Sequence, residues 1–292
     1  MASLKEVKSR ISSVMSTQQI TKAMKMVAAA KLRKSQERII QMRPFAEKMN
    51  GLLQNLSADQ SNGQGWYSVI REEKKVLIVA ISSDRGLCGS FNSSVFKATL
   101  RLIEEKYSKQ HQQKNVTILP IGKKSAEFFT KRSFPVVTAY ATIFQDLSFE
   151  KVAEAGQFLM DQFRLGEFDK IEIVFNEFKN VATQILRIDQ WLPVLPLKVD
   201  KKANAVDYIF QPNQEEIITG MIPKSLKVQL FKAMLESNAS ENGARMTAMD
   251  KATENAGDLL KDLRLTYNRT RQAAITKEIL EIVAGAEALK SA

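Results

Sequence analysis

The sequence has very few of the side chains that form disulfides, zinc sites or nucleophilic catalytic sites. Cys88 is the only cysteine and His111 the only histidine. A single cysteine excludes an internal disulfide, and with it thiol control through such a bond, and it also excludes a cysteine zinc cluster. His111 lies in the polar stretch KQHQQK, which predicts a surface position and leaves no nucleophile–base–acid set to assign. We therefore expect no metal site and no catalytic residue in this chain.

Long apolar runs and targeting segments are also missing. The apolar C-terminal stretch EIVAGAEALKSA needs cover, but it is too short and too charged to span a bilayer. No signal peptide precedes the first heptad, and no transit segment is evident. We expect a chain that is cytosolic or attached to a membrane only through its partners.

The sequence also lacks a complete phosphate-binding motif. The loop SSDRGLCGSFN at 82–92 follows a strand-like run and carries Gly86 and Gly89, at a position that often binds phosphate in α/β folds. Neither G-x-G-x-x-G nor a P-loop can be written through it. The stretch GKKS at 122–125 also fails as a P-loop, because Thr117 stands where the first glycine is needed. We expect no cofactor.

The two ends of the chain, in contrast, have a clear helical periodicity. Leu4, Val7, Ile11 and Val14 step by three and four residues, which is the seam of a coiled coil. The same frame continues through polar or small residues and becomes apolar again towards residue 57: Gln18, Thr21, Lys25, Ala28, Ser35, then Ile39, Met42, Met49, Leu53 and Leu56. This pattern predicts a helix with a seam that is weak at its centre, and a long helix docked on its own domain is the alternative.

Residues 215–292 form the second helical end. We expect Pro223 to interrupt its start, because proline cannot donate a backbone hydrogen bond. Small residues that permit close helix approach crowd its first half: Ala239, Ser240, Gly243, Ala244, Thr247, Ala248, Ala252, Ala256 and Gly257. Two long helical ends around an inserted domain predict that the ends pair with each other.

The middle of the chain alternates between strand-like and helical segments. The strand-like segments are residues 76–83, 116–122, 135–141, 170–178 and 183–188, and the helical ones are about 95–107, 123–132 and 149–164. This alternation favours a mainly parallel sheet covered by helices, entered through a turn-rich linker at 55–65. The predicted fold class is α/β: long N- and C-terminal helices (1–57 and 215–292) that pair with each other, with an α/β domain (58–214) inserted between them.

The positive charge is concentrated on the first helix. The net charge is +11, and residues 1–57 carry eleven lysines and arginines against three glutamates. Six cations form a basic stripe: Lys22, Lys25, Lys31, Arg33, Lys34 and Arg38. Such a stripe fits nucleic acid, anionic lipid or an acidic protein surface, or is simply solvated. No aromatic residue lies among these cations to stack on bases, which weakens the nucleic-acid alternative.

Three long segments resemble one protein family. Residues 10–34, RISSVMSTQQITKAMKMVAAAKLRK, resemble the N-terminal signature of the gamma subunit of F-type ATP synthases of bacterial type, and residues 240–289 resemble its C-terminal signature. The loop at 82–92 matches a third segment of that family. The three segments occur in family order, and the resemblance covers essentially the whole chain.

The resemblance implies a central rotary shaft that couples proton flow to ATP synthesis or hydrolysis. In that family the terminal helices form a long antiparallel coiled coil inside a ring of alternating alpha and beta subunits. The inserted Rossmann-like α/β domain sits beside epsilon on the membrane c-ring. The implied chain is a non-catalytic subunit, peripheral at the cytoplasmic face of the bacterial inner membrane, with no nucleic-acid partner. The nucleotide sites lie in other chains. A nucleic-acid-binding protein and a nucleotide-dependent enzyme are the rival functions.

The match to the family also implies which residues contact partners. On the first helix these are Met24, Lys25, Lys31 and Arg33, facing an acidic loop of the catalytic subunit. On the last helix they are Arg245, Arg271, Gln272, Thr276 and Glu278. Two positions depart from the family pattern: Gln19 replaces a usual lysine, and Gln211 replaces a common glutamate near the membrane ring.

Overall fold

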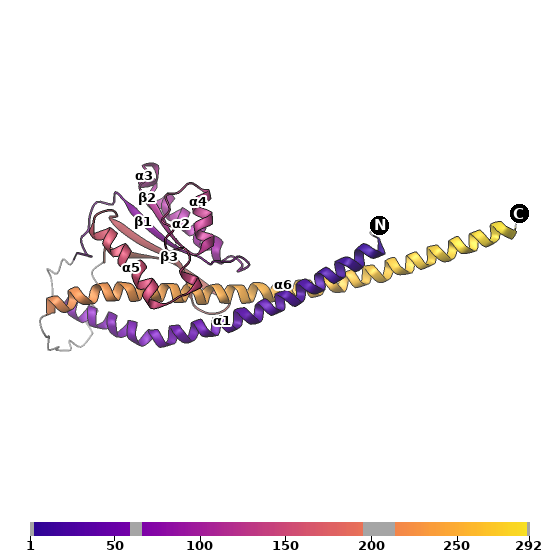
Figure 1. Ribbon diagram of the computed structural model, residues 1–292, viewed down its shortest axis with the longest axis horizontal. Coiled ribbons are helices and arrows are strands. Elements are labelled where there is room, and N and C mark those ends of the chain that lie inside the picture. The colour runs from indigo at the N-terminus through magenta and orange to yellow at the C-terminus, as the bar shows by residue number, and fades with distance from the viewer. Residues whose placement is uncertain (1–2, 59–65, 195–213, 291–292) are drawn as a thin grey trace. The chain divides into compact units, whose positions relative to one another are not determined.

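A computed structural model describes residues 3–58, 66–194 and 214–290. The position of Gln211 and the end of the stretch at 55–65 lie outside these ranges. In chain order the elements are α1 (Leu4–Ala58), β1 (Val76–Ile81), α2 (Phe91–Lys106), α3 (Ser108–Gln112), β2 (Val116–Ile121), α4 (Lys123–Lys131), the short 3₁₀ helix η1 (Ile143–Gln145), α5 (Phe149–Arg164), β3 (Lys170–Phe178), β4 (Gln184–Leu192) and α6 (Gln214–Lys290) (Figure 1).

The chain divides into two compact units, and each long helix contributes to both. The first unit, here the helix-pair unit, consists of Met1–Ala28 and Met246–Ala292. The second, the sheet unit, consists of Ala29–Arg245. The sheet unit therefore contains the whole α/β domain together with one part of α1 and one part of α6.

Within the described ranges, the sheet has four strands in the order β2-β1-β3-β4. β1 pairs in parallel with β2 and with β3, and β4 pairs antiparallel with β3 at the edge. All six residues of β1 are buried, as expected for a central parallel strand that is covered on both faces. The predicted mainly parallel α/β sheet is confirmed.

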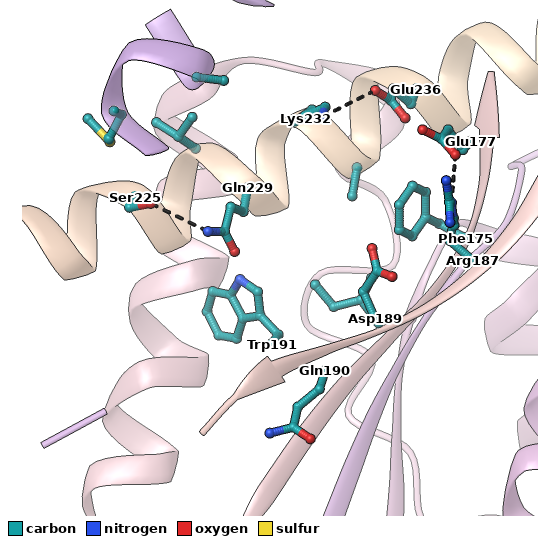
Figure 2. Close-up of a pocket in the computed structure, with 15 residues that line it drawn as sticks. Phe175, Glu177, Arg187, Asp189, Gln190, Trp191, Ser225, Gln229, Lys232 and Glu236 are labelled. Carbon is teal, nitrogen blue, oxygen red and sulfur yellow. Dashed lines mark hydrogen bonds and ion pairs between the residues drawn. The ribbon is translucent and has the colours of Figure 1, made fainter. Parts of the chain in front are cut away.

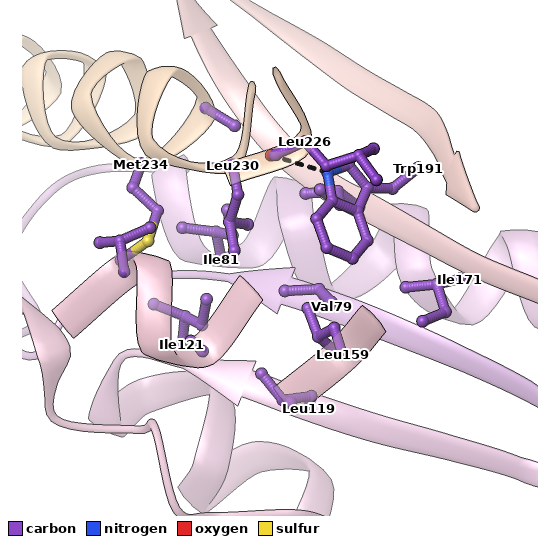
Figure 3. Packing of buried hydrophobic residues seen from close by; sticks show 14 of the residues in the cluster. Val79, Ile81, Leu119, Ile121, Leu159, Ile171, Trp191, Leu226, Leu230 and Met234 are labelled. Carbon is purple, nitrogen blue, oxygen red and sulfur yellow. Dashed lines mark hydrogen bonds between the residues drawn. The ribbon is translucent and has the colours of Figure 1, made fainter. Parts of the chain in front are cut away.

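Each face of the sheet supports its own apolar cluster. On one face, Val79 and Ile81 pack with Leu159 of α5 and with Leu226 and Leu230 of α6 (Figure 3). The other face packs against α2 and α4 through a second set: Val76, Ile78, Val95, Ile103 and Phe129. Since α6 supplies part of the first cluster, the beginning of the C-terminal helix is built into the core of the sheet unit.

The strand expected at 135–141 is wrong. Only one isolated bridge forms there, between Ile118 of β2 and Val136. Pro135 supplies its carbonyl to the Ile118 amide at 2.9 Å but has no amide of its own to extend a ladder. The chain then turns, and Tyr140 packs against the first apolar cluster. The apolar residues of this segment serve the core without forming a fifth strand.

The expected interruption at Pro223 is also wrong, because α6 is assigned as one helix of 77 residues that contains this proline. The 55 residues of α1 likewise contain Pro44. Proline in a helix interior costs about 3 kcal/mol. Packing offsets this cost at α6, where Ser225 and Leu226, two and three residues after the proline, are 3% and 2% exposed. Within the described residues, no helix is apolar over a length that could cross a membrane.

Candidate functional site: the paired terminal helices

In the helix-pair unit, α1 and α6 run antiparallel and contact each other through polar side chains. The Gln18 amide donates to the Thr253 carbonyl at 3.4 Å, and the Thr253 and Thr21 hydroxyls are 2.8 Å apart. One turn further along α1, the Lys25 ammonium pairs with Asp250 at 2.5 Å. Later residues of α1 therefore meet earlier residues of α6, which confirms the antiparallel pairing.

Small residues keep the two helices of this unit close. Ala28 is 1% exposed and Ala256 is 7% exposed. A Cβ added at Gly257 would lie 3.0 Å from the Gln18 amide nitrogen. The seam therefore joins the helices by close approach and hydrogen bonds, with few large apolar contacts.

The sheet unit continues the same pairing with a more apolar seam. Leu32 and Ile39 of α1 cluster with Leu235 and Ala239 of α6. The Ser35 hydroxyl donates to the Asn238 side chain at 2.6 Å. Ser35 and Ile39 belong to the heptad frame predicted from the sequence, and both are buried. Leu32 occupies the frame position between Ala28 and Ser35, so the centre of the seam is less polar than expected.

Large apolar side chains are exposed along the helix-pair unit. On α1 they are Met15, Ile20, Met26 and Val27, and on α6 they are Leu259, Leu265, Ile275, Ile279, Leu280, Ile282 and Val283. Four of them, Ile279, Leu280, Ile282 and Val283, fall within five residues of α6, and such a group of exposed apolar side chains is a candidate interaction site. Lys22, a basic residue of α1, is also exposed.

The expected contact residues of the helix-pair unit differ in their surroundings. Met24 and Lys25 are half-buried, and the charge of Lys25 is already matched by Asp250. The four expected residues near the C-terminus are all exposed: Arg271, Gln272, Thr276 and Glu278. The Thr276 hydroxyl donates to the Gln272 carbonyl at 2.9 Å, which is a bond within the helix. These four side chains are accessible to a partner.

On the part of α1 in the sheet unit, Lys31 and Arg33 are exposed. Arg33 pairs with Glu37 at 3.2 Å, but their side chains are 84% and 59% exposed. Such a surface pair within one helix contributes only a few tenths of a kcal/mol. Both cations therefore remain available to an acidic partner.

Arg245 has a role within the chain that the sequence did not reveal. Its side chain is only 13% exposed and is paired with the Glu241 carboxylate one turn earlier on α6. Its second amino group, Nη2, donates to the carbonyls of Arg85 and Gly86 at 3.0 and 3.2 Å. Burial raises the pKa of Glu241, and the charge of Arg245 opposes that shift. Glu241 lies inside the C-terminal signature at 240–289, but its pairing with Arg245, which in turn binds the distant loop at 82–92, is visible only in the structure.

The loop at 82–92 uses its polar groups internally. The Asn92 side chain accepts from the Ser83 amide at 3.0 Å. The Asp84 carboxylate accepts from the Lys123 amide at 3.1 Å, at the start of α4. A carboxylate therefore occupies a helix start that would favour an anion. These contacts give no support to phosphate binding by this loop.

The sheet unit also contains a cavity of about 330 Å³ between α1, the β3–β4 edge and α6 (Figure 2). Three carboxylates line it: Glu177, Asp189 and Glu236. Arg187 pairs with Glu177 at 2.6 Å, and Lys232 is 3.9 Å from Glu236. Burial raises the pKa of both Asp189 and Glu236. Among the residues that the structure describes, no cluster of histidine, cysteine or carboxylate side chains could hold a metal ion.

Comparison with known proteins gives one consistent answer. The family described as ATP synthase matches residues 3–289. The chain is 57% identical over 295 residues to the ATP synthase gamma chain of Cytophaga hutchinsonii, with both chains covered in full. It is 53% identical to the gamma chain of Flavobacterium psychrophilum, covering 99% of this chain and all of the relative.

Solved structures agree with these sequence relatives. A chain from the central stalk and c-ring of the Tetrahymena thermophila mitochondrial ATP synthase is 27% identical, with a TM-score of 0.58, over 80% of this chain and 99% of the other. A chain from the Euglena gracilis mitochondrial ATP synthase shares the fold, with a TM-score of 0.69 at 22% identity, over 98% of this chain and 94% of the other. The family match, the full-length relatives and the paired terminal helices together show that the chain belongs to the ATP synthase gamma chain family.

Proposed function

We propose that the chain is the central rotary shaft of an F-type ATP synthase and couples proton flow through the membrane sector to ATP synthesis or hydrolysis at the alpha/beta ring. The observation that carries this proposal is the antiparallel pair of terminal helices with exposed apolar and basic side chains. A shaft inside a sleeve of subunits needs such a continuous outer surface. Its partners are the alpha, beta, epsilon and c-ring subunits.

The chain itself is a non-catalytic subunit in this proposal. The loop at 82–92 directs its polar groups inward, and Asp84 occupies the adjacent helix start. Relatives from bacteria support a place at the cytoplasmic face of the inner membrane, where the chain is held peripherally through the c-ring.

The contact residues follow from the same proposal. Lys31 and Arg33 are exposed cations that fit an acidic loop on the beta subunit. Met24 and Lys25 lie about two turns earlier on the same helix. The exposed C-terminal set, namely Arg271, Gln272, Thr276 and Glu278, fits contact with the ring that surrounds the shaft. Arg245 belongs to the set as well, although its guanidinium is engaged within the chain.

Reconstitution tests the shaft directly. The purified chain is mixed with alpha and beta subunits, and magnesium-dependent ATP hydrolysis is compared for the chain alone and for the complex. We expect a complex of three alpha, three beta and one gamma that hydrolyses ATP, and no hydrolysis by the chain alone. Hydrolysis by the single chain at rates comparable to the complex would contradict the non-catalytic role.

Met24→Lys tests the contact with the acidic loop. An added cation at that contact should make it too strong, because a charge pair that is partly removed from water is costly to break. We expect ATP hydrolysis to persist while proton pumping per ATP falls in membrane vesicles. Met24→Leu is the matched control, because it changes the same side chain without adding a charge. Equal pumping by the Met24→Lys variant and the wild type would show that Met24 does not face the loop.

A further inference from the structure

The loop at 84–90 presents an apolar side chain in a disfavoured backbone conformation. Leu87 has φ 63° and its side chain is 66% exposed. Leucine disfavours the left-handed backbone region. Because the Leu87 side chain is exposed, no buried apolar contact offsets that cost. The surrounding structure must therefore impose this conformation. Strained backbone conformations that are held by their surroundings cluster at functional sites.

From the inside, the loop is held by side chains of its own ends. The Ser83 hydroxyl donates to the Arg85 carbonyl at 2.6 Å. The Asn92 amide lies 3.3 Å from the Cys88 sulfur, and Cys88 is 1% exposed. These bonds fix the base of the loop beneath its exposed apex at Arg85–Leu87.

From the outside, the apex is held by α6 through Arg245. One guanidinium nitrogen spans the carbonyls of Arg85 and Gly86, while the other is paired with Glu241. Glu241 is 12% exposed on its side chain, so the pair is largely removed from water. The same arginine thus joins a position on the C-terminal helix to a loop 160 residues away in sequence.

We propose that Arg245, oriented by Glu241, is a positioning residue that locks the 84–90 loop to α6, so that Leu87 and Arg85 move with the helix as one body. This inference rests on the proposed shaft function, because the locked loop then transmits rotation of α6 to whatever its apex touches. A loose loop would absorb part of that rotation.

The buried thiol of Cys88 offers a built-in probe of the lock. Burial raises the pKa of Cys88, and the positive charge of Arg245 opposes that shift. The thiolate is the nucleophile that attacks a thiol reagent such as a maleimide. Removing Arg245 would therefore slow labelling if only the charge mattered, whereas loosening of the loop would speed it. The two explanations predict opposite signs.

The first experiment measures the rate at which a maleimide labels Cys88 in the folded full-length chain. Arg245→Gln should label about tenfold faster or more than the wild type, because two charge-assisted hydrogen bonds are lost. Arg245→Lys keeps the charge but lacks the planar fork, so it should also label faster. Arg101→Gln is the control, since Arg101 forms the same i,i+4 pair with Glu105 but at an exposed site. An unchanged or slower rate for both Arg245 variants would overturn the lock.

The second experiment measures proton pumping per ATP hydrolysed by the assembled complex in vesicles. The Arg245 variants should retain ATP hydrolysis and lose coupling, a split that loss of fold stability would not produce. Faster labelling with wild-type coupling would show that the lock is structural only and would overturn its positioning role. Failure of the wild-type chain to assemble would instead overturn the proposed shaft function and leave the labelling result intact.

Discussion

The structure predicts a large loss of stability when the buried carboxylate of Glu172 loses its charge. The side chain of Glu172 is 3% exposed on β3. Its Oε1 accepts from the Tyr107 hydroxyl at 2.7 Å and pairs with the Lys106 ammonium at 2.5 Å. A further cation, Lys170, lies 3.9 Å away and is itself 9% exposed. Glu172→Gln keeps the shape of the side chain and removes the charge that these two lysines share.

The expected magnitude follows from burial. Breaking a buried pair by removing one partner costs about 3–5 kcal/mol. Two features reduce the loss here: Lys106 is 44% exposed and can turn to water, and Lys170 keeps Glu73 at 2.6 Å. We therefore expect Glu172→Gln to lower the free energy of unfolding by about 2–3 kcal/mol. Tyr107→Phe loses one hydrogen bond to the same carboxylate and should cost about 1–2 kcal/mol.

Urea unfolding of the full chain measures both variants. The fluorescence of Trp191, which is 3% exposed in the sheet unit, reports unfolding of that unit. Glu127→Gln is the control: it makes the same substitution in an exposed ion pair with Lys124 and should change stability by less than about 0.5 kcal/mol. If Glu172→Gln were no worse than this control, the buried cluster would not stabilise the fold through its charges.

Two further predictions concern buried polar groups elsewhere. Thr21→Val or Thr253→Val alone should lower the free energy of unfolding by about 1 kcal/mol, because each change leaves the other hydroxyl without its partner across the seam. The double variant should therefore cost less than the sum of the two single variants. Additive shifts of the melting temperature would contradict this coupling. Glu236 has a pKa raised by burial from 4.5, so the folded state keeps its proton to higher pH than the unfolded state does. The stability that it contributes is therefore present below pH 4.5 and is lost as pH rises through the folded pKa. Glu236→Gln should flatten that decline and be more stable than the wild type at pH 7, and a steeper decline in the variant would refute the assignment.

Local patterns predicted most of the elements well. The helix expected at 149–164 and the strand at 170–178 have the same bounds in α5 and β3. Both have strong periodicity or continuous apolar runs, and both are buried by neighbours on the sheet, so local preference and packing agree. The strand predicted at 135–141 does not form, because a strand there would have to pair with the edge strand β2. Only the bridge between Ile118 and Val136 forms, and Pro135 has no amide with which to extend it.

The candidate site was only partly accessible to sequence reasoning. The heptad frame located buried seam residues such as Val7, Thr21 and Ile39 because helical periodicity is a local property. The internal contacts of Arg245 could not be foreseen in the same way. They depend on the tertiary position of a loop 160 residues earlier and on two backbone carbonyls. Every residue has a backbone carbonyl, so the residue types at these positions do not reveal the contact. A family motif marks such a residue as important without saying what it touches.

The composition of the helix-pair unit explains why the chain needs partners. Among the residues of this unit whose burial is described, few side chains are buried: Val7, Thr21, Ala28, Met249, Ala256 and Leu260. More large apolar side chains are exposed than buried there, including Ile20, Val27 and Ile282 at 60%, 57% and 71%. Two helices joined by a narrow seam of small and polar residues bury too little apolar area to hold each other firmly. A surrounding ring of subunits would cover the exposed side chains and add the missing burial. The narrow seam and the exposed outer side chains therefore complement each other: assembly with the surrounding subunits completes the pairing of the terminal helices.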